Sequence, residues 1–367
     1  MVATTASLER LVSVRTRDFE DDSRLPDVGA NGAQSPSRDA EGDADLDTRA
    51  SDDGRGVAVF GVEAEAAGYD TVFTTCHYNN RDPFAVLSRL ASETDEIRLG
   101  PGVANPYDRH PVALAGQVAT LAEASDGRAV FGIGPGDPST LRNLGLADER
   151  GLRSVLEAFT VARRLWDGER VDHDGTFSAD SAGLNYEPPG DIPVYVGGEG
   201  PHMCRLAAKH ADGLLVNGSH PDDLRWAREQ VEIGGEERPA DRGDFELAAY
   251  ASVSVAEERD AAREAARPAV AFIAAGAAPP VLSRHGIDRE LAGEIGDHIS
   301  AGRFSAAFEA VTPAMVDAFC MAGTVEEVSE RMEAVGEHVE GIVVGSPLGP
   351  DLDSAIGLAA AAHAASR

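Results

Sequence analysis

The chain has 367 residues and a formal net charge of −31, from 63 acidic and 32 basic side chains. So acidic a surface repels phosphates and argues against a nucleic-acid partner, whereas it is typical of proteins that stay soluble in concentrated salt. The length fits one large barrel of alternating strands and helices, and we expect a salt-adapted source.

The amino-terminal part of the chain differs in composition from the rest. Residues 19–56 are dense in Asp, Ser, Gly, Ala and Arg and nearly free of large apolar side chains. Such a segment cannot bury enough surface to offset the entropy of ordering. We therefore expect residues 1–55 to be disordered or atypical and residues 56–367 to form the barrel domain.

From Val57 onward, short apolar runs alternate with amphipathic helical stretches, which is the pattern of βαβ units. Several helices open with Pro in the first turn, where its missing N–H does little harm. Helices are expected at Pro83–Glu93, Pro111–Ala124, Leu152–Trp166, Pro201–Ala211, Pro221–Val231 and Val325–Glu337. Strands are expected at Asp70–Thr75, Ile97–Val103, Arg128–Ile133, Ile192–Val196, Gly213–Asn217, Leu247–Val253 and Gly341–Gly345.

The first strand of this barrel is uncertain, because seven strands follow Tyr69 and a closed barrel needs eight. Gly56–Val62 has strand composition, but only Glu63–Gly68 separates it from the next strand. That is too short for a crossover helix of roughly a dozen residues. Either Val57–Gly68 is the first helix and its strand lies upstream, or the chain is abnormal here.

A long alanine-rich stretch, Ala269–Phe319, separates the last two expected strands. A barrel does not need it to close, so we expect it to cover a ligand or a partner subunit. The predicted fold is therefore an α/β (β/α)8 TIM-like barrel with a helical insertion before the last strand.

Two glycine-rich runs follow expected strands. Phe131–Asp137 places glycines and a carboxylate at the carboxyl end of a strand, which is the catalytic face of a barrel, although Asp137 could equally cap the next helix. Tyr195–Pro201 passes through glycines into a helix, where free N–H groups can bind phosphate. An ordinary strand-to-helix turn is the alternative, and Glu199 argues against a bare anion site.

Two further runs are candidates for the same face. Thr75–Asp82 is unusually polar, and its His77 is either a ligand-facing donor or base, or a structural histidine. Gly100–Tyr107 ends another strand, where a kinked loop without chemistry is the alternative. No H-E-x-x-H, C-x-x-C, G-x-S-x-G or Walker-type sequence occurs, so we predict no metal and no hydrolase or nucleotide-triphosphatase chemistry.

The cysteines and apolar segments bear on the cellular compartment. Cys76, Cys204 and Cys320 form no C-x-x-C pair, which fits a reducing compartment. Ala269–Ala278 and Ile356–Ala365 are too short to cross a bilayer, and the amino terminus lacks the order of a signal peptide. We expect a cytoplasmic protein without membrane association.

Taken in order, several motifs resemble one family. They are HYNNRD, LGPGVANPY, GRAVFGIGPGD, PVYVGGEGPHM, KHADGLLVNG, VAFIAAGAAPPVLSRHGID and VVGSPLGPD. Over residues 64–352 the chain resembles the archaeal 5,10-methylenetetrahydromethanopterin reductases of the luciferase-like superfamily. The resemblance implies coenzyme F420 as hydride donor, a pterin whose methylene group becomes methyl, and a homo-oligomer. For a haloarchaeal member a folate carrier is an alternative to methanopterin.

The resemblance also assigns residues to the coenzyme. It implies a non-prolyl cis peptide at Gly102–Val103 that supports the deazaflavin ring, with His77 close to the ring. The other residues expected to bind the coenzyme are Asn105 in the following loop, Gly134, Pro135, Gly136 and Asp137 at the polar edge, and Gly197, Gly198 and Gly200 at the phosphate.

The reaction that the resemblance implies needs a proton to open the carrier's ring, and a buried carboxyl with a raised pKa suits that role. The family uses a glutamate on the first strand, and Val59–Glu63 is similar to that strand. Glu63 is thus a catalytic candidate, with Asp137 and His77 as alternatives. Cys76 stands where relatives often have Asp. Another F420- or flavin-dependent oxidoreductase, acting on an alcohol or sugar phosphate, and a non-catalytic coenzyme-binding relative remain the alternatives.

Overall fold

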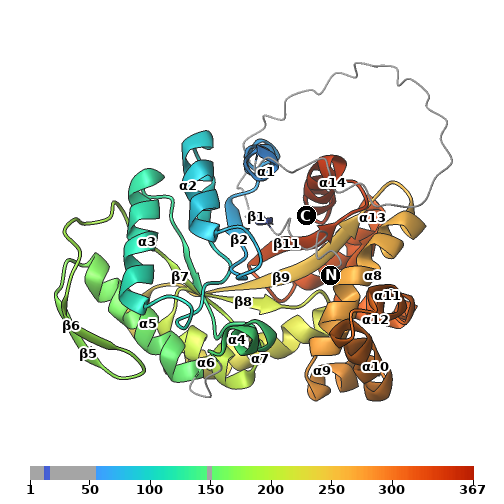
Figure 1. Ribbon diagram of the computed structural model, residues 1–367. Coiled ribbons are helices and arrows are strands. Elements are labelled where there is room, and N and C mark those ends of the chain that lie inside the picture. Colours follow the sequence, from blue (N-terminus) through green and yellow to red (C-terminus); the bar gives the residue numbers. More distant parts are fainter. Residues whose placement is uncertain (1–11, 17–54, 147–150) are drawn as a thin grey trace.

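A computed structural model describes residues 12–16, 55–146 and 151–367 of the chain (Figure 1). Within these residues, nine strands form one sheet with a central path β3-β2-β1-β11-β9-β8-β7-β4, and β10 pairs with the end of β9. Isolated bridges join Leu99 to Ala129 and Ala104 to Ile133, so β3 meets β4 and the path closes into a barrel. The strands of the path are β1 (Val12–Thr16), β2 (Thr71–Thr74), β3 (Arg98–Pro101), β4 (Phe131–Ile133), β7 (Val194–Gly197), β8 (Gly213–Asn217), β9 (Glu246–Val255) and β11 (Gly341–Leu348); β10 is Met321–Gly323.

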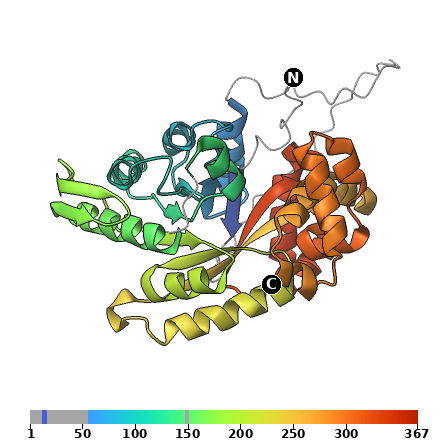
Figure 2. The ribbon, with the colours of Figure 1, turned by 60° about the horizontal axis from the view of Figure 1, so that its bottom comes forward.

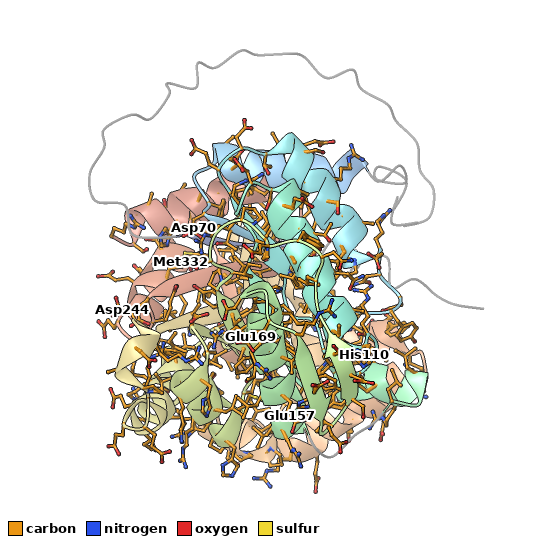
Figure 3. The ribbon with its side chains drawn as sticks, turned by 90° about the vertical axis from the view of Figure 1, so that its left-hand side faces the viewer. Asp70, His110, Glu157, Glu169, Asp244 and Met332 are labelled. Carbon is orange, nitrogen blue, oxygen red and sulfur yellow. The ribbon has the colours of Figure 1, made fainter. Side chains whose placement is uncertain are left out.

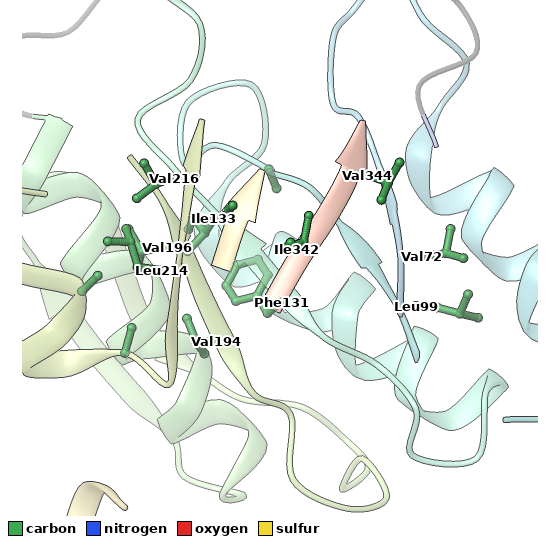
Figure 4. Close-up of a cluster of buried hydrophobic side chains, with 14 of the residues drawn as sticks. Val72, Leu99, Phe131, Ile133, Val194, Val196, Leu214, Val216, Ile342 and Val344 are labelled. Atoms are coloured by element: carbon green, nitrogen blue, oxygen red, sulfur yellow. The ribbon is translucent and has the colours of Figure 1, made fainter. Parts of the chain in front are cut away.

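The barrel wall separates two apolar layers, because successive side chains of a strand point to opposite faces. On β8, Leu214 and Val216 face outward to the helices whereas Leu215 faces the interior. Figure 4 shows the outward layer, which β2, β3, β4, β7 and β11 continue. The interior is filled by Phe73, Val130, Tyr195, Leu215, Ala248 and Val343, so the barrel is a packed core and not a pore.

Helices surround the barrel (Figure 1). A proline occupies the first turn of several of these helices, as expected. The side chain of the residue before the proline often caps the helix; Asp82, for example, accepts the N–H of Ala85 at 3.0 Å. The helices packed around the wall are α1 (Arg55–Ala66), α2 (Pro83–Glu93), α3 (Pro111–Ala124), α5 (Gly151–Trp166), α6 (Pro201–His210), α7 (Pro221–Gly235), α13 (Val325–Gly336) and α14 (Leu352–Ala365).

The segment before β2 is the helix α1, so the first of the two alternatives for Val57–Gly68 is confirmed. Phe60 and Ala64, one turn apart, are buried, whereas Glu63 is exposed. Gly68, at a φ of +84°, ends the helix, where Tyr69 N–H donates to Ala64 O at 3.1 Å. The helical period of burial therefore prevails over the strand-like composition.

The strand upstream of α1 is β1, and it differs from a standard barrel strand. Its backbone pairs antiparallel with both β11 and β2, for example Val14 with Val344 and with Val72. In a (β/α)8 barrel all neighbours run parallel. The position of the first strand is therefore filled by a strand of reversed direction. Residues 1–11 and 17–54 of the expected segment 1–55 lie outside the described residues.

Two additions flank the barrel on opposite sides (Figure 2). One is the hairpin β5 (Val171–Asp174) and β6 (Ser178–Ala182), which follows α5 and which the sequence did not predict. The other is the predicted helical insertion. It consists of α8 (Arg259–Gly276), α9 (Pro279–Arg284), α10 (Arg289–Ser300), α11 (Phe304–Glu309) and α12 (Pro313–Phe319), which share a separate apolar core.

No helix within residues 55–146 and 151–367 combines the length and the apolar character that a membrane span requires.

Candidate active site

The residues expected to bind a coenzyme follow β2, β3, β4 and β7, so they meet at the carboxyl-terminal edge of the barrel. The structure brings most of them together around Val103. A Cβ placed on Gly134 would lie 2.8 Å from a Val103 methyl and 3.0 Å from Gly197 O, and a Cβ on Gly197 would lie 2.9 Å from the same methyl. The glycines of two separate motifs therefore make room for one side chain.

Val103 follows a non-prolyl cis peptide with Gly102, as the resemblance implied. Gly102 N–H donates to Thr74 O at 2.8 Å, which ties this turn to the end of β2. The Val103 side chain is half-buried and packs over Gly134 and Gly197. It forms an apolar shelf at the centre of the barrel mouth, of the kind on which a flat ring can rest.

The run after β4 forms a turn into the short helix α4 (Pro138–Leu144). Gly136 has a φ of +76°, a conformation that favours glycine, and half-buried Pro135 precedes it. The Asp137 carboxylate accepts Thr140 N–H at 2.8 Å and caps α4. The capping interpretation of Asp137 is thus confirmed, while its side chain remains exposed at the mouth.

The polar runs after β2 and β3 take different roles. His77 is half-buried, and its Nδ1 lies 3.2 Å from Thr140 Oγ1 of α4. Asn105 is buried, and its Oδ1 accepts the N–H groups of Tyr107 at 3.0 Å and Asp108 at 3.1 Å. The carboxamide oxygen of Asn105 therefore stabilises its own loop, whereas His77 lines the mouth beside α4.

The turn between β7 and α6 ends in an uncapped helix start. Gly200 is the N-cap residue of α6 and has no side chain to satisfy the first amides. A Cβ on Gly200 would meet no atom of the described residues within 4 Å, whereas one on Gly198 would collide with Met203. Open space thus lies in front of a positive helix end, which is the arrangement that binds a phosphate.

Glu199 lies in the same turn, and sequence reasoning gave it no role. Its side chain is exposed to solvent, although nearby protein desolvates the carboxyl in part. Desolvation raises the pKa of Glu199, a hydrogen bond from Asn217 opposes this, and the charge of Asp223 adds to the rise. A signal was present in the sequence, namely a carboxylate among glycines that follow a buried strand.

Glu63 does not belong to this edge, and the expectation that it lies on the first strand is wrong. Two residues further along α1, the Glu65 carboxylate accepts the N–H groups of Glu96 at 2.6 Å and Ile97 at 2.8 Å. These amides precede β3, so this part of α1 lies at the amino-terminal end of the barrel. Glu63 is exposed there, on the outer layer of helices and opposite the mouth.

The site contains no evident metal centre. Among the residues that the structure describes, no group of three or more His, Cys, Asp or Glu side chains is placed to hold an ion. Cys76, next to His77, is half-buried, and burial raises its pKa to about 12, which keeps it a neutral thiol.

Comparisons with known proteins agree with this geometry. Residues 35–339 match the family model described as luciferase-like monooxygenase. A 5,10-methylenetetrahydromethanopterin reductase of Archaeoglobus fulgidus is 41% identical over 301 residues, which are 80% of this chain and 90% of that protein. The corresponding enzyme of Methanopyrus kandleri is 37% identical, over 80% of this chain and 90% of its own length.

Solved structures give the same result. The coenzyme F420-dependent tetrahydromethanopterin reductase of Methanopyrus kandleri superposes with a TM-score of 0.79 at 36% identity, covering 84% of this chain and 94% of its own. An F420-dependent secondary alcohol dehydrogenase has a TM-score of 0.71 at 21% identity and covers 86% of this chain and 96% of its own, so it shares the fold. The chain belongs to the luciferase-like family and, within it, to the 5,10-methylenetetrahydromethanopterin reductases.

Proposed function

We propose that this chain uses reduced coenzyme F420 to convert the methylene group of 5,10-methylenetetrahydromethanopterin, or of its folate counterpart, to methyl. The observation that carries the proposal is the joint packing of Gly134 and Gly197 against Val103, beside the open helix start at Gly200. This arrangement offers a shelf for a flat ring and a site for a phosphate on one face. Reductases of this name are 37–41% identical to the chain.

The residues present fit the coenzyme. Val103 would support the ring, the backbone of Gly134–Asp137 would meet its polar edge, and His77 would lie beside it. The turn Gly197–Gly200 would hold the phosphate, because the absent side chain of Gly200 leaves that space open. Bound F420 supplies the hydride; the protein's own residues orient it, exclude water and provide the proton that opening the carrier requires.

The cellular environment, the oligomeric state and the size of the substrate belong to the same proposal. A net charge of −31 supports a salt-rich cytoplasm, where screening lets so acidic a protein stay folded and soluble. The family resemblance and the alanine-rich helices are the basis for expecting a homo-oligomer. We infer that the substrate is a small reduced pterin, since the residues expected to bind the coenzyme meet at the barrel mouth.

The test is to mix purified full-length protein with reduced F420 and each methylene carrier in molar potassium chloride and to follow absorbance of the oxidised coenzyme. Oxidation that requires one carrier supports the proposal and identifies the pterin. Coenzyme binding without oxidation by either carrier contradicts it, and trials with secondary alcohols and sugar phosphates then distinguish another oxidoreductase from a non-catalytic relative.

A further inference from the structure

The inward side chains of the barrel form layers, and the order of the strands determines which residues share a layer. In an eight-stranded barrel of this kind, each layer draws its side chains from alternate strands. Along the closed path β3-β2-β1-β11-β9-β8-β7-β4, the strands β3, β1, β9 and β7 form one alternating set. Within this set, β3 and β9 lie on opposite sides of the barrel. Residues of these two strands in one layer therefore face each other across the interior.

Tyr250 of β9 faces the interior and lies in the layer at the mouth. It pairs with Val343 of β11, a member of the inner apolar cluster, and it packs against that cluster, as Val103 also does. Ala248, two residues earlier on β9, is fully buried within the cluster. Tyr250 and Val103 are both half-buried. Each side chain therefore covers the packed interior below it and is accessible to solvent above.

Strand β7 contributes no side chain to this layer. Its inward position is Gly197, which follows the inward-facing Tyr195 by two residues and pairs with Leu215 of the inner cluster. On β3 the chain continues through Gly102 into Val103, whose methyl groups pack over Gly197. Of the strands β3, β7 and β9, only β3 and β9 thus present a side chain at this level of the mouth. Val103 and Tyr250 therefore border the mouth from opposite sides.

The two sides of the mouth offer different surfaces to a ligand. Val103 presents methyl groups, whereas Tyr250 presents an aromatic ring. Such a ring covers a large apolar area and prefers edge or offset contact with another flat ring. Asn217 of β8, which pairs with Tyr250, is exposed and adds a carboxamide on the same side. The side formed by β8 and β9 therefore suits a flat heterocycle with polar edges.

Resting on the function proposed above, we propose that Tyr250 binds the one-carbon carrier. Its ring contacts the heterocycle of the pterin or folate and holds the methylene carbon against the coenzyme on the Val103 side. Transfer between two bound molecules requires the reacting atoms to approach to about 3–3.5 Å in the correct orientation. Tyr250 supplies that orientation and takes part in no bond making or breaking.

Tyr78 is the rival aromatic side chain near the mouth. It follows His77 in the loop after β2, it is 54% exposed, and its hydroxyl accepts a hydrogen bond from Asn143 Nδ2 of α4 at 3.2 Å. Tyr250 instead belongs to a strand that is paired on both sides. Side chains on such strands orient a ligand more precisely than side chains on loops. Tyr250 is therefore favoured over Tyr78.

The test compares Tyr250→Leu and Tyr250→Phe with Tyr78→Leu and with the control Tyr186→Leu. Tyr186 is also half-buried, but it lies beside α3, where its hydroxyl donates to Gly116 O at 3.0 Å. We expect Tyr250→Leu to lower kcat/KM for the carrier by about 10–100-fold, because small misplacements of a reacting group cost up to about 100-fold. Tyr250→Phe keeps the ring and should stay within about threefold of the wild type, and the control should match the wild type.

A second measurement does not depend on turnover. The tetrahydro form of each carrier, which lacks the methylene group, is titrated by calorimetry into protein saturated with oxidised F420. The dissociation constant of the carrier should rise about tenfold in Tyr250→Leu, as expected for the loss of one aromatic contact, and less than about threefold in Tyr250→Phe. The dissociation constant of oxidised F420, read from its fluorescence, should change less than about threefold in both variants.

Three outcomes would overturn the carrier contact. They are a wild-type kcat/KM and carrier affinity in Tyr250→Leu, a loss that only Tyr78→Leu shows, and an equal weakening of carrier and F420 in Tyr250→Leu. The last outcome is what a merely structural role of Tyr250 produces. Wild-type protein that binds F420 but neither tetrahydro carrier would instead overturn the proposed function, and the carrier contact with it.

Discussion

Replacement of Gly197 by Ala tests whether the glycines at the mouth exist to accommodate Val103. The added Cβ would lie 2.9 and 3.0 Å from the two Val103 methyls and 3.5 Å from its Cβ, and no other atom is among its nearest contacts. Carbon atoms prefer about 3.5–4.0 Å, so both methyl contacts are repulsive while the third is ordinary. Overpacking of this kind destabilises by about 1–3 kcal/mol.

The compensating change is Val103→Ala, which removes both methyls and leaves the ordinary contact. Alone, it should destabilise by about 1 kcal/mol, because the side chain is only half-buried. In the double variant the clash disappears, so the two losses should not add, and we expect a favourable coupling of about 1–2 kcal/mol.

The assay is thermal unfolding of the four proteins in one buffer at one scan rate, where 1 kcal/mol corresponds to about 2–4 °C. Recovery of Tm in the double variant, relative to the sum of the single changes, supports the packing argument. Strict additivity would refute it and would mean that Gly197 is needed for another reason, such as backbone approach to a ligand.

Three further predictions concern separate parts of the molecule. Gly200→Ala should leave Tm within 1 °C, because no atom of the described residues meets the new Cβ, yet it should weaken F420 binding about tenfold by entering the phosphate space. Unchanged affinity in a fluorescence titration would mean that this turn does not bind the phosphate. Glu157→Gln should destabilise by about 1–2 kcal/mol, a figure reduced for screening, because hydrogen bonds from Thr176, Arg153 and His173 outweigh desolvation and hold the pKa of Glu157 at about 2. That stability is present above the ordinary pKa of 4.5 and is lost as pH falls towards 2, so unfolding curves of the two proteins should converge in acid. Glu199→Gln should raise Tm at pH 7 and not below about pH 4, since a raised carboxyl pKa means that wild-type stability falls as pH rises through the interval above 4.5; an equal effect at both pH values would contradict this sign.

The Glu157 prediction concerns how the unpredicted hairpin is attached. The Glu157 carboxylate of α5 accepts Thr176 N–H at 2.6 Å, at the turn between β5 and β6, and His173 Nε2 lies 3.1 Å away. His173 also packs against Phe177, which meets His110 of the loop before α3. Glu157 and His110 both lie beside this hairpin in Figure 3. The Glu157 carboxylate and the contacts of His110 thus both attach the hairpin to the barrel.

Short-range sequence patterns predicted the helices that short-range interactions stabilise. Pro at the first helical turn and a regular apolar period located α2 and α3 to the residue, because capping and helix periodicity operate within a few positions of the sequence. The hairpin was missed since β5 and β6 are mostly exposed and polar and so lack an alternating apolar pattern. Its order comes from tertiary contacts with α5 and α3.

Glu63 shows why composition alone was misleading at the first strand. The run around Phe60 is rich in valine, which favours strands, but a helix is selected by what it can bury. Phe60 and Ala64 reach the barrel, and Gly61 allows α2 to approach so closely that a Cβ would lie 2.3 Å from a Leu90 methyl. These contacts belong to residues about 30 positions apart, beyond the reach of a local pattern.

The environment of Glu199 depends on separations that are longer still. Glu199 meets Asn217 only because β7 and β8 pair in one register, and Arg284 and His285 of the insertion hold the Asp223 carboxylate whose charge acts on it. The sequence shows a glutamate among glycines, which argues against a plain anion site, but it does not show the neighbours that raise the pKa of this glutamate.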